Sequence, residues 1–252
     1  MNLFALEQIP EIMPGMDLAG VLAERSQQAG VCPGDIVCIA HKIVSKAEGR
    51  LIRLDQVSVG PAARQLAATN SKDPRLLELI LRESRRIVRR RGSLLICETH
   101  HGFICANAGI DASNVPHGHV VLLPRDPDRS ARRLQSAIAA RVGGRIGVVI
   151  TDTHGRPFRR AIINVAIGVA GFEPVVDHRG GHDREGRMLI ATEQALADEL
   201  AAAAGILMDK GGGYPVVVVR GVATTPAPGT VAELVRAPAH DLFRDCEGEA
   251  AQ

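Results

Sequence analysis

RIGVVITDTHGRPFRR, residues 145–160, is the stretch around which the chain is organised. Its apolar run at 146–150 predicts a buried strand, because Val and Ile favour strands and Gly bounds the run. We expect the strand to end at Thr151-Asp152-Thr153, where a loop would present Asp152 and two hydroxyls. A carboxylate beside hydroxyls, with Arg159 and Arg160 following, suits a hard cation and the phosphates it neutralises. The alternative is a capped turn followed by a solvated arginine pair.

The composition excludes several classes of function. The 252 residues include 46% apolar residues, enough for a substantial core, and only 2% aromatic residues. So few aromatics argue against base stacking on single-stranded nucleic acid, and a net charge of +2 provides no general attraction for polyanions. The apolar runs are too short to span a membrane. The five cysteines form no CxxC pair, and Glu7 and Glu11 interrupt any signal peptide, so we expect a cytoplasmic protein with reduced thiols.

Hydrophobic periodicity and turn residues predict a mixed set of elements. The expected strands lie near the start of 3–12 and at 36–40, 94–98, 102–106, 120–123, 161–169 and 216–220. The expected helices lie at 17–28, 73–91, 126–142 and 192–204. Because the strands come in adjacent runs rather than in strict alternation with helices, we predict an α+β or mixed α/β fold. We expect one domain over residues 1–252, with a weakly structured tail from about 237 to 252.

Three further segments carry polar groups suited to a ligand. Residues 41–50, HKIVSKAEGR, read as a basic loop after a strand, in which Lys42 and Lys46 could grip phosphate. Residues 107–115, NAGIDASNV, could coordinate a cation through Asp111 and bind a ligand through Asn114. The Gly-rich residues 177–188 are long enough to form a lid. The first two segments also have ordinary alternatives, a solvated basic loop for 41–50 and an Asx-turn loop for 107–115.

Common catalytic signatures are missing from the chain. There is no HExxH zinc motif, no GxGxxG fingerprint, no GxSxG elbow and no P-loop. A zinc site at His117 and His119 is disfavoured for lack of partners. Two acidic loops and three basic segments remain, and oxygen ligands near Lys and Arg indicate Mg²⁺ or Mn²⁺ with a nucleotide rather than zinc.

Four strings together resemble one known family. They are IVSKAEGR (43–50), NAGIDASNV (107–115), ITDTHGRPFRR (150–160) and VAIGVAG (165–171). Their order and extent are similar to the coenzyme F420-0:gamma-L-glutamate ligase family, in the stand-alone form without a C-terminal nitroreductase-like domain. The resemblance implies the mixed α/β fold of that family and an intertwined homodimer. It also implies a GTP-dependent enzyme that joins γ-linked L-glutamate to the carboxylate of F420-0, a deazaflavin, giving F420-1 or longer products, GDP and phosphate.

The resemblance also implies roles for individual residues. Two divalent ions, Mg²⁺ or Mn²⁺, would be held by Asp111, Asp152 and Thr153, and K⁺ is a further candidate. GTP would contact Gln8, Ile9, Pro10, Glu11, His41, Lys42, Lys46 and Asn114. On the chemistry of phosphoryl transfer we add Lys46, Arg159 and Arg160 as catalytic helpers that neutralise developing charge, and residues 177–188 as a lid that excludes water.

Some positions depart from the family pattern and keep alternatives open. Met208-Asp209-Lys210 stands where the family usually has a Gln or an acidic metal ligand, and Asp-His-Arg at 177–179 replaces an expected aromatic. His41-Lys42 also replaces a family Ser or Thr. One alternative is a related ligase with another acid acceptor or amino acid. Another is a non-catalytic homologue that binds a nucleotide or F420.

Overall fold

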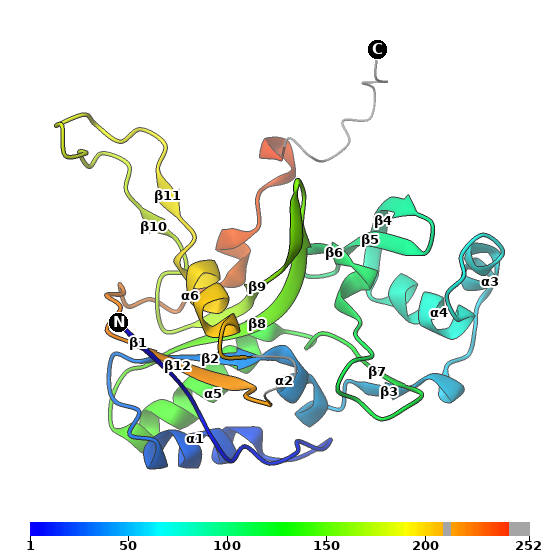
Figure 1. Ribbon diagram of the computed structural model, residues 1–252, viewed down its shortest axis with the longest axis horizontal. Coiled ribbons are helices and arrows are strands. Elements are labelled where there is room, and N and C mark those ends of the chain that lie inside the picture. The colour runs from blue at the N-terminus through cyan, green and yellow to red at the C-terminus, as the bar shows by residue number, and fades with distance from the viewer. Residues whose placement is uncertain (209–212, 242–252) are drawn as a thin grey trace.

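The computed structural model describes residues 1–208 and 213–241, and its centre is a five-stranded mixed sheet (Figure 1). The strand order is β1 (Asn2–Ala5), β12 (Val216–Arg220), β2 (Ile36–Ala40), β8 (Gly147–Arg156) and β9 (Arg159–Ala170). β2 and β8 are parallel, and the other neighbours are antiparallel. The predicted strands 36–40 and 216–220 are confirmed, as is the mixed α/β character of the fold.

Helices cover both faces of this sheet (Figure 1). α1 (Leu18–Gln28) and α5 (Pro127–Val142) pack together on one face, and α6 (Leu196–Gly205) packs on the other. The strands are apolar on both faces because both are buried, which explains continuous runs such as that at 146–150. The predicted helix 126–142 is confirmed: the Asp126 side chain accepts from Arg129 N, and Gly143 ends the helix at φ 77°.

A second unit with its own core lies between residues 51 and 121 of the chain. Its elements are β3 (Leu51–Arg53), η1 (Leu54–Gln56), α3 (Pro61–Ala67), α4 (Pro74–Arg82), β4 (Ser84–Arg91), β5 (Leu94–Thr99), β6 (Ile104–Ala106), η2 (Asn107–Gly109) and β7 (His119–Val121). They form a β4–β5–β6 sheet and a β3–β7 pair around a separate cluster of buried apolar side chains. This unit supports the loop that carries Asp111, because Asp111 forms an isolated bridge with Val121.

The remaining elements are short. β10 (Val176–Asp177) and β11 (Glu193–Gln194) form the base of a projecting arm, and η3 (Val231–Leu234) and η4 (Pro238–His240) follow β12 (Figure 1). Part of the predicted tail, residues 242–252, lies outside the described residues. Within the described part of the chain, no helix combines the length and apolarity that a membrane crossing requires.

The predicted basic loop at 41–50 is wrong over most of its length, because His41–Ala47 form helix α2. Ile43 and Val44 are buried against the core, and Ala47 packs beside them, so tertiary packing overrides the polar composition. Gly49, at φ 71°, ends the helix in the left-handed conformation. The consequence is that His41, Lys42 and Lys46 project from a rigid element.

The predicted helix 73–91 is also wrong in its second half. α4 ends at Arg82, and 84–91 form strand β4, paired antiparallel with β5. The β-branched pair Ile87-Val88 favours a strand, and Gly92 at φ 56° lies in the turn to β5. The arginines therefore line a strand rather than a helix C-terminus, and Arg86 donates to Glu98 Oε2 at 2.9 Å.

Residues 145–160 differ from the prediction in one respect that matters for function. β8 does not stop at Thr151 but continues to Arg156, paired with β9 down to the contact between Arg156 and Arg159. The β-branched Thr151 and Thr153 are suited to a strand, and the partner β9 satisfies their backbone groups. Asp152 thus projects from a paired strand and not from an open loop.

An ion pair between the buried Asp35 and the partly exposed Arg220 ties β12 to the turn before β2. Arg220 donates from Nε to Asp35 Oδ1 at 2.8 Å and from Nη2 to Oδ2 at 2.6 Å, and Cys32 N donates to Oδ2 at 2.9 Å. Burial alone raises the pKa of Asp35, but these hydrogen bonds outweigh it and leave the pKa below its usual value. A carboxyl with a lowered folded-state pKa stabilises the fold above its unfolded pKa, and that contribution is lost as the pH falls through the folded-state pKa.

Replacing Arg220 by Met should therefore lower the free energy of unfolding at pH 7, because the buried Asp35 carboxylate loses its partner. The variant's Asp35 should have a raised pKa, so the difference from the parent should shrink as the pH falls below about 4. Urea unfolding at pH 7 and at pH 3.5 measures both values. Equal stability of the two proteins at pH 7 would contradict the role given to the pair.

A candidate nucleotide-binding active site

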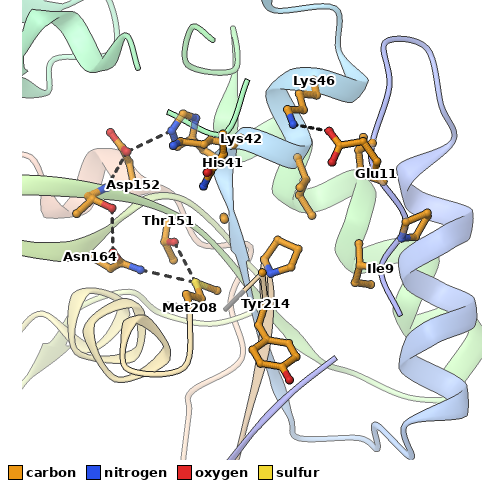
Figure 2. Close-up of a pocket in the computed structure, with 18 residues that line it drawn as sticks. Ile9, Glu11, His41, Lys42, Lys46, Thr151, Asp152, Asn164, Met208 and Tyr214 are labelled. Carbon is orange, nitrogen blue, oxygen red and sulfur yellow. Dashed lines mark hydrogen bonds and ion pairs between the residues drawn. The ribbon is translucent and has the colours of Figure 1, made fainter. Parts of the chain in front are cut away.

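One cavity of about 520 Å³ lies at the end of the central strands, where β2 ends and α2 begins (Figure 2). Ala40 of β2 pairs with Thr151 of β8, and Val216 of β12 pairs with Ile39, so three strands meet there. Ligands commonly bind beyond the carboxyl ends of parallel strands, which is the position of this cavity relative to β2. The lining residues are Ile9, Pro10, Glu11, Ile12, Ala40, His41, Lys42, Ile43, Lys46, Asn114, Thr151, Asp152, Thr153, Asn164, Met208, Gly213, Tyr214 and Pro215.

Asp152 is the most strongly perturbed carboxyl group at the cavity. Its Oδ1 lies 3.2 Å from His41 Nε2, and its Oδ2 lies 3.2 Å from His154 Nε2. Burial alone raises the pKa of Asp152, but the charge of His41 and the contacts of both imidazoles hold that pKa far below its usual range. A carboxylate that stays ionised although only 12% exposed can offer an oxygen ligand to a cation, provided that the cation displaces an imidazole from one of its oxygens.

Lys42, next to His41 on α2, joins the acidic loop 107–115 to the cavity. Its Nζ lies 2.7 Å from Asp111 Oδ2 and donates to Ser113 Oγ at 2.5 Å. Burial opposes ionisation of Asp111, but the hydrogen bonds from Lys42 and from Ser113 N leave its pKa below the usual value. Consecutive residues of α2 therefore contact both predicted metal-binding aspartates, which come from distant parts of the sequence.

Lys46 lies one turn further along α2 and faces the N-terminal segment. Its side chain is 9% exposed, and its Nζ donates to Glu11 Oε1 at 2.6 Å (Figure 2). Glu11 is 73% exposed, so the ammonium can exchange this partner for a ligand without leaving a buried carboxylate unpaired. The geometry offers a positive charge within the cavity wall.

Sequence reasoning missed several lining residues, of which Asn164 is the most informative. Thr153 Oγ1 donates to Asn164 Oδ1 at 3.1 Å, and Asn164 Nδ2 and Thr151 Oγ1 both point to Met208 Sδ (Figure 2). A single polar residue inside the otherwise apolar prediction 161–169 was the available signal. Tyr214, Pro215 and Gly213 carried no signal, because they have no distinctive spacing.

Some predicted site residues lie away from this cavity. Gln8 accepts a hydrogen bond from Arg25 and does not line the cavity, unlike its neighbours Ile9, Pro10 and Glu11. Arg159 and Arg160 lie near the exposed end of the β8–β9 hairpin, and none of residues 177–188 lines the cavity. Asp209 and Lys210, which stand where the family usually has a metal ligand, lie outside the described residues.

The donors present fit a divalent cation in part. Asp152 offers an ionised carboxylate and Thr153 a hydroxyl, both hard oxygen ligands that line the cavity. Asp111 does not line it and is bound by Lys42, so a cation could use this carboxylate only after displacing the ammonium. Across residues 1–208 and 213–241, no three or more His, Cys, Asp or Glu side chains are grouped so that they could hold a metal ion. His117 and His119 are therefore not part of such a group.

Comparison with known proteins identifies the family. The family model described as F420-0:Gamma-glutamyl ligase matches residues 7–221. The chain is 44% identical over 247 residues to the coenzyme F420:L-glutamate ligase of Methanopyrus kandleri, covering 95% of this chain and 97% of that protein. It is 42% identical to the ligase of that name from Methanothermobacter thermautotrophicus, with 96% and 98% covered. The corresponding ligase of Archaeoglobus fulgidus is 39% identical, with 97% of each chain covered.

The family match covers every residue that lines the cavity. The resemblance carried by the four sequence strings is thereby confirmed. The chain belongs to the F420-0:gamma-glutamyl ligase family.

Proposed function

We propose that this protein is a GTP-dependent ligase that adds γ-linked L-glutamate to coenzyme F420-0 through an acyl phosphate. Family membership supports the addition of glutamate to F420-0. The observation that most favours the nucleotide-dependent route is the ionised, buried Asp152 in a cavity that also contains Lys42 and Lys46. Such a site combines a cation-binding carboxylate with positive charges for phosphate oxygens.

The chemistry follows from the need to activate a carboxylate before an amine can attack it. A carboxylate oxygen of F420-0 would attack the γ-phosphorus of GTP, so that the bond to GDP breaks and an acyl phosphate forms. The glutamate amine would then attack the acyl carbon, form the amide, lose a proton and release phosphate. The protein's main contribution is alignment and neutralisation of charge.

Residues of the cavity divide these tasks. Lys46 would exchange Glu11 for a phosphate oxygen, and Lys42 would do the same on leaving Asp111. Asp152 and Thr153, joined by Asp111, would hold Mg²⁺ or Mn²⁺, which when bound supplies charge neutralisation of the triphosphate. His41 and His154 would hold the Asp152 carboxylate in place, each through one of its oxygens. Ile9 and Pro10 form an apolar wall that suits the base or the ribose.

The reaction is tested by mass spectrometry of the deazaflavin after incubation with GTP, L-glutamate and Mg²⁺ or Mn²⁺. We expect a mass gain of one glutamyl residue or more and consumption of GTP that requires both other substrates. Binding of GTP without any product would favour the alternative of a non-catalytic homologue, for which the occupation of Asp111 by Lys42 is the supporting observation. A product that forms only when another amino acid replaces L-glutamate would favour the related ligase.

The assembly is proposed to be an intertwined homodimer in the cytoplasm. Two projecting segments expose large apolar side chains: Phe158 and Ile162 at 89% and 55% on the β8–β9 hairpin, and Met188 and Ile190 at 61% and 81% on the arm after β10. Contiguous exposed apolar groups commonly mark protein interfaces. Light scattering after gel filtration should give twice the chain mass, and a monomer at micromolar concentration would contradict the proposal.

Arg159 and Arg160 remain proposed to neutralise charge during phosphoryl transfer. Their exposed position allows a separate expectation for stability and for activity. Both side chains are exposed near the hairpin end, so replacing either by Ala should leave thermal stability unchanged. If one contributes charge to phosphoryl transfer, its variant should lose about tenfold or more in kcat/KM. Steady-state kinetics with each single variant decides, and unchanged turnover in both would remove them from the mechanism.

A further inference from the structure

Two hydrogen-bond donors at the cavity floor are paired with a poor acceptor. Thr151 Oγ1 lies 3.7 Å from Met208 Sδ, and Asn164 Nδ2 lies 3.6 Å from the same sulfur. A thioether sulfur is a weak acceptor, whereas a buried hydroxyl and an amide normally find oxygen partners. Thr151 is only 2% exposed, so solvent does little to satisfy its hydroxyl. The two donors are thus available for a better acceptor.

The Asn164 amide is held in the orientation that this acceptor would need. Its Oδ1 accepts from Thr153 Oγ1 at 3.1 Å, which directs Nδ2 toward Thr151 and Met208 (Figure 2). Gly205 of α6 leaves room for it, since a Cβ there would lie 3.1 Å from Asn164 Cγ and Nδ2. Contacts from two elements therefore fix the side chain, so little freedom remains to be lost on binding.

We propose that Thr151 and Asn164 form an oxyanion-binding pair that takes an oxygen of a substrate phosphate or carboxylate when Met208 Sδ gives way. The inference deepens the proposed ligase function and rests on it only for the identity of the ligands. Both donors are neutral, so they add hydrogen bonds without another charge beside Asp152. They face the cavity from β8 and β9, whereas Lys42 and Lys46 face it from α2, so a bound anion would be held from two directions.

The test compares isosteric variants in direct binding. Thr151→Val removes the hydroxyl and keeps the branched shape, and Thr151→Ser keeps the hydroxyl. Asn164→Asp retains the acceptor for Thr153 and replaces the donor by a negative charge. Asn2→Asp, at an exposed position on β1, is the matched control for the charge. Each variant is titrated calorimetrically with GTP and Mg²⁺, with GDP, and with L-glutamate, and its thermal midpoint is recorded.

We expect Thr151→Val and Asn164→Asp to weaken binding of one anion about tenfold or more, equivalent to ~1.4 kcal/mol. The dissociation constants of Thr151→Ser and Asn2→Asp should stay within about twofold of those of the parent. A loss confined to GTP and GDP assigns the pair to phosphate, and a loss confined to L-glutamate assigns it to a carboxylate.

Unchanged binding of all three ligands in Thr151→Val would overturn the inference, as would an equal loss in Thr151→Ser. If Asn164→Asp does not fold, the comparison of Thr151→Val with Thr151→Ser still decides the test. Because binding is measured without turnover, a failure of the ligase reaction is distinguishable: the parent would then bind anions through this pair and yet form no amide.

Discussion

Replacing Asp152 by Asn is expected to lower kcat/KM at least about 10³-fold. The amide has nearly the shape of the carboxylate but no charge, so the cavity would lose the anion that faces His41 and His154. In the proposed mechanism the same loss removes the principal ligand for the divalent ion. Product formation from F420-0, GTP and L-glutamate, measured over a range of Mg²⁺ concentrations, gives the effect.

The matched control is Asp17→Asn, at a side chain that is 73% exposed and 3.6 Å from Arg133. This variant should keep the parent's kinetics, since it changes the same charge at a residue that does not line the cavity. Circular dichroism and a melting curve establish that Asp152→Asn is folded. A folded Asp152→Asn protein with kinetics within a factor of about three of the parent would contradict the role of this carboxylate, because that factor is below 1 kcal/mol.

Replacing Lys46 by Gln should lower kcat/KM for GTP by about 10²-fold. Lys46 is nearly buried in the wall of the cavity, and its only described partner, Glu11, is mostly exposed. Loss of a charge in a poorly solvated wall weakens its interaction with a triphosphate more than loss of a surface charge does. Initial rates at varied GTP, with F420-0 and glutamate saturating, separate KM from kcat.

Lys72→Gln serves as the control for the lost ammonium, because Lys72 Nζ donates to Ser93 O in the second unit of the fold. We expect its kinetics to match the parent. Nucleotide binding that is equally strong in Lys46→Gln and in the parent would show that the Lys46–Glu11 pair is only structural. In that event Lys42 would remain as the ammonium available to the phosphates.

The fold was predictable from sequence where local pattern and tertiary packing agree. The strands at 36–40 and 216–220 are buried on both faces and read as continuous apolar runs, and the helix after Asp126-Pro127 has its cap and its terminal glycine. The residues 41–47 and 84–91 were misassigned because their charged side chains dominate the local pattern. Their conformations are set by burial of Ile43 and Val44 in one case and by pairing with β5 in the other.

The candidate site was predictable to a similar extent and for related reasons. Asp152, Lys46 and Asn114 stand in strings that resemble the family, His41 and Lys42 directly precede one of these strings, and all five line one cavity. Asn164 and Met208 were not assigned to the site, since their proximity to Thr151 and Thr153 arises from the pairing of β8 with β9 and the packing of α6. The register between β8 and β9 and the position of the end of α6 bring these groups together. No local sequence motif encodes either of these tertiary features.

Oxygen transfer tests most directly the central claim, that a nucleoside triphosphate activates the acid as an acyl phosphate. F420-0 labelled with ¹⁸O in its terminal carboxylate is converted with GTP and L-glutamate, and the phosphate is examined by mass spectrometry. The account predicts one ¹⁸O in each phosphate released and none in GDP, because a carboxylate oxygen attacks the γ-phosphorus and leaves with it. Amide product formed together with unlabelled phosphate would contradict it.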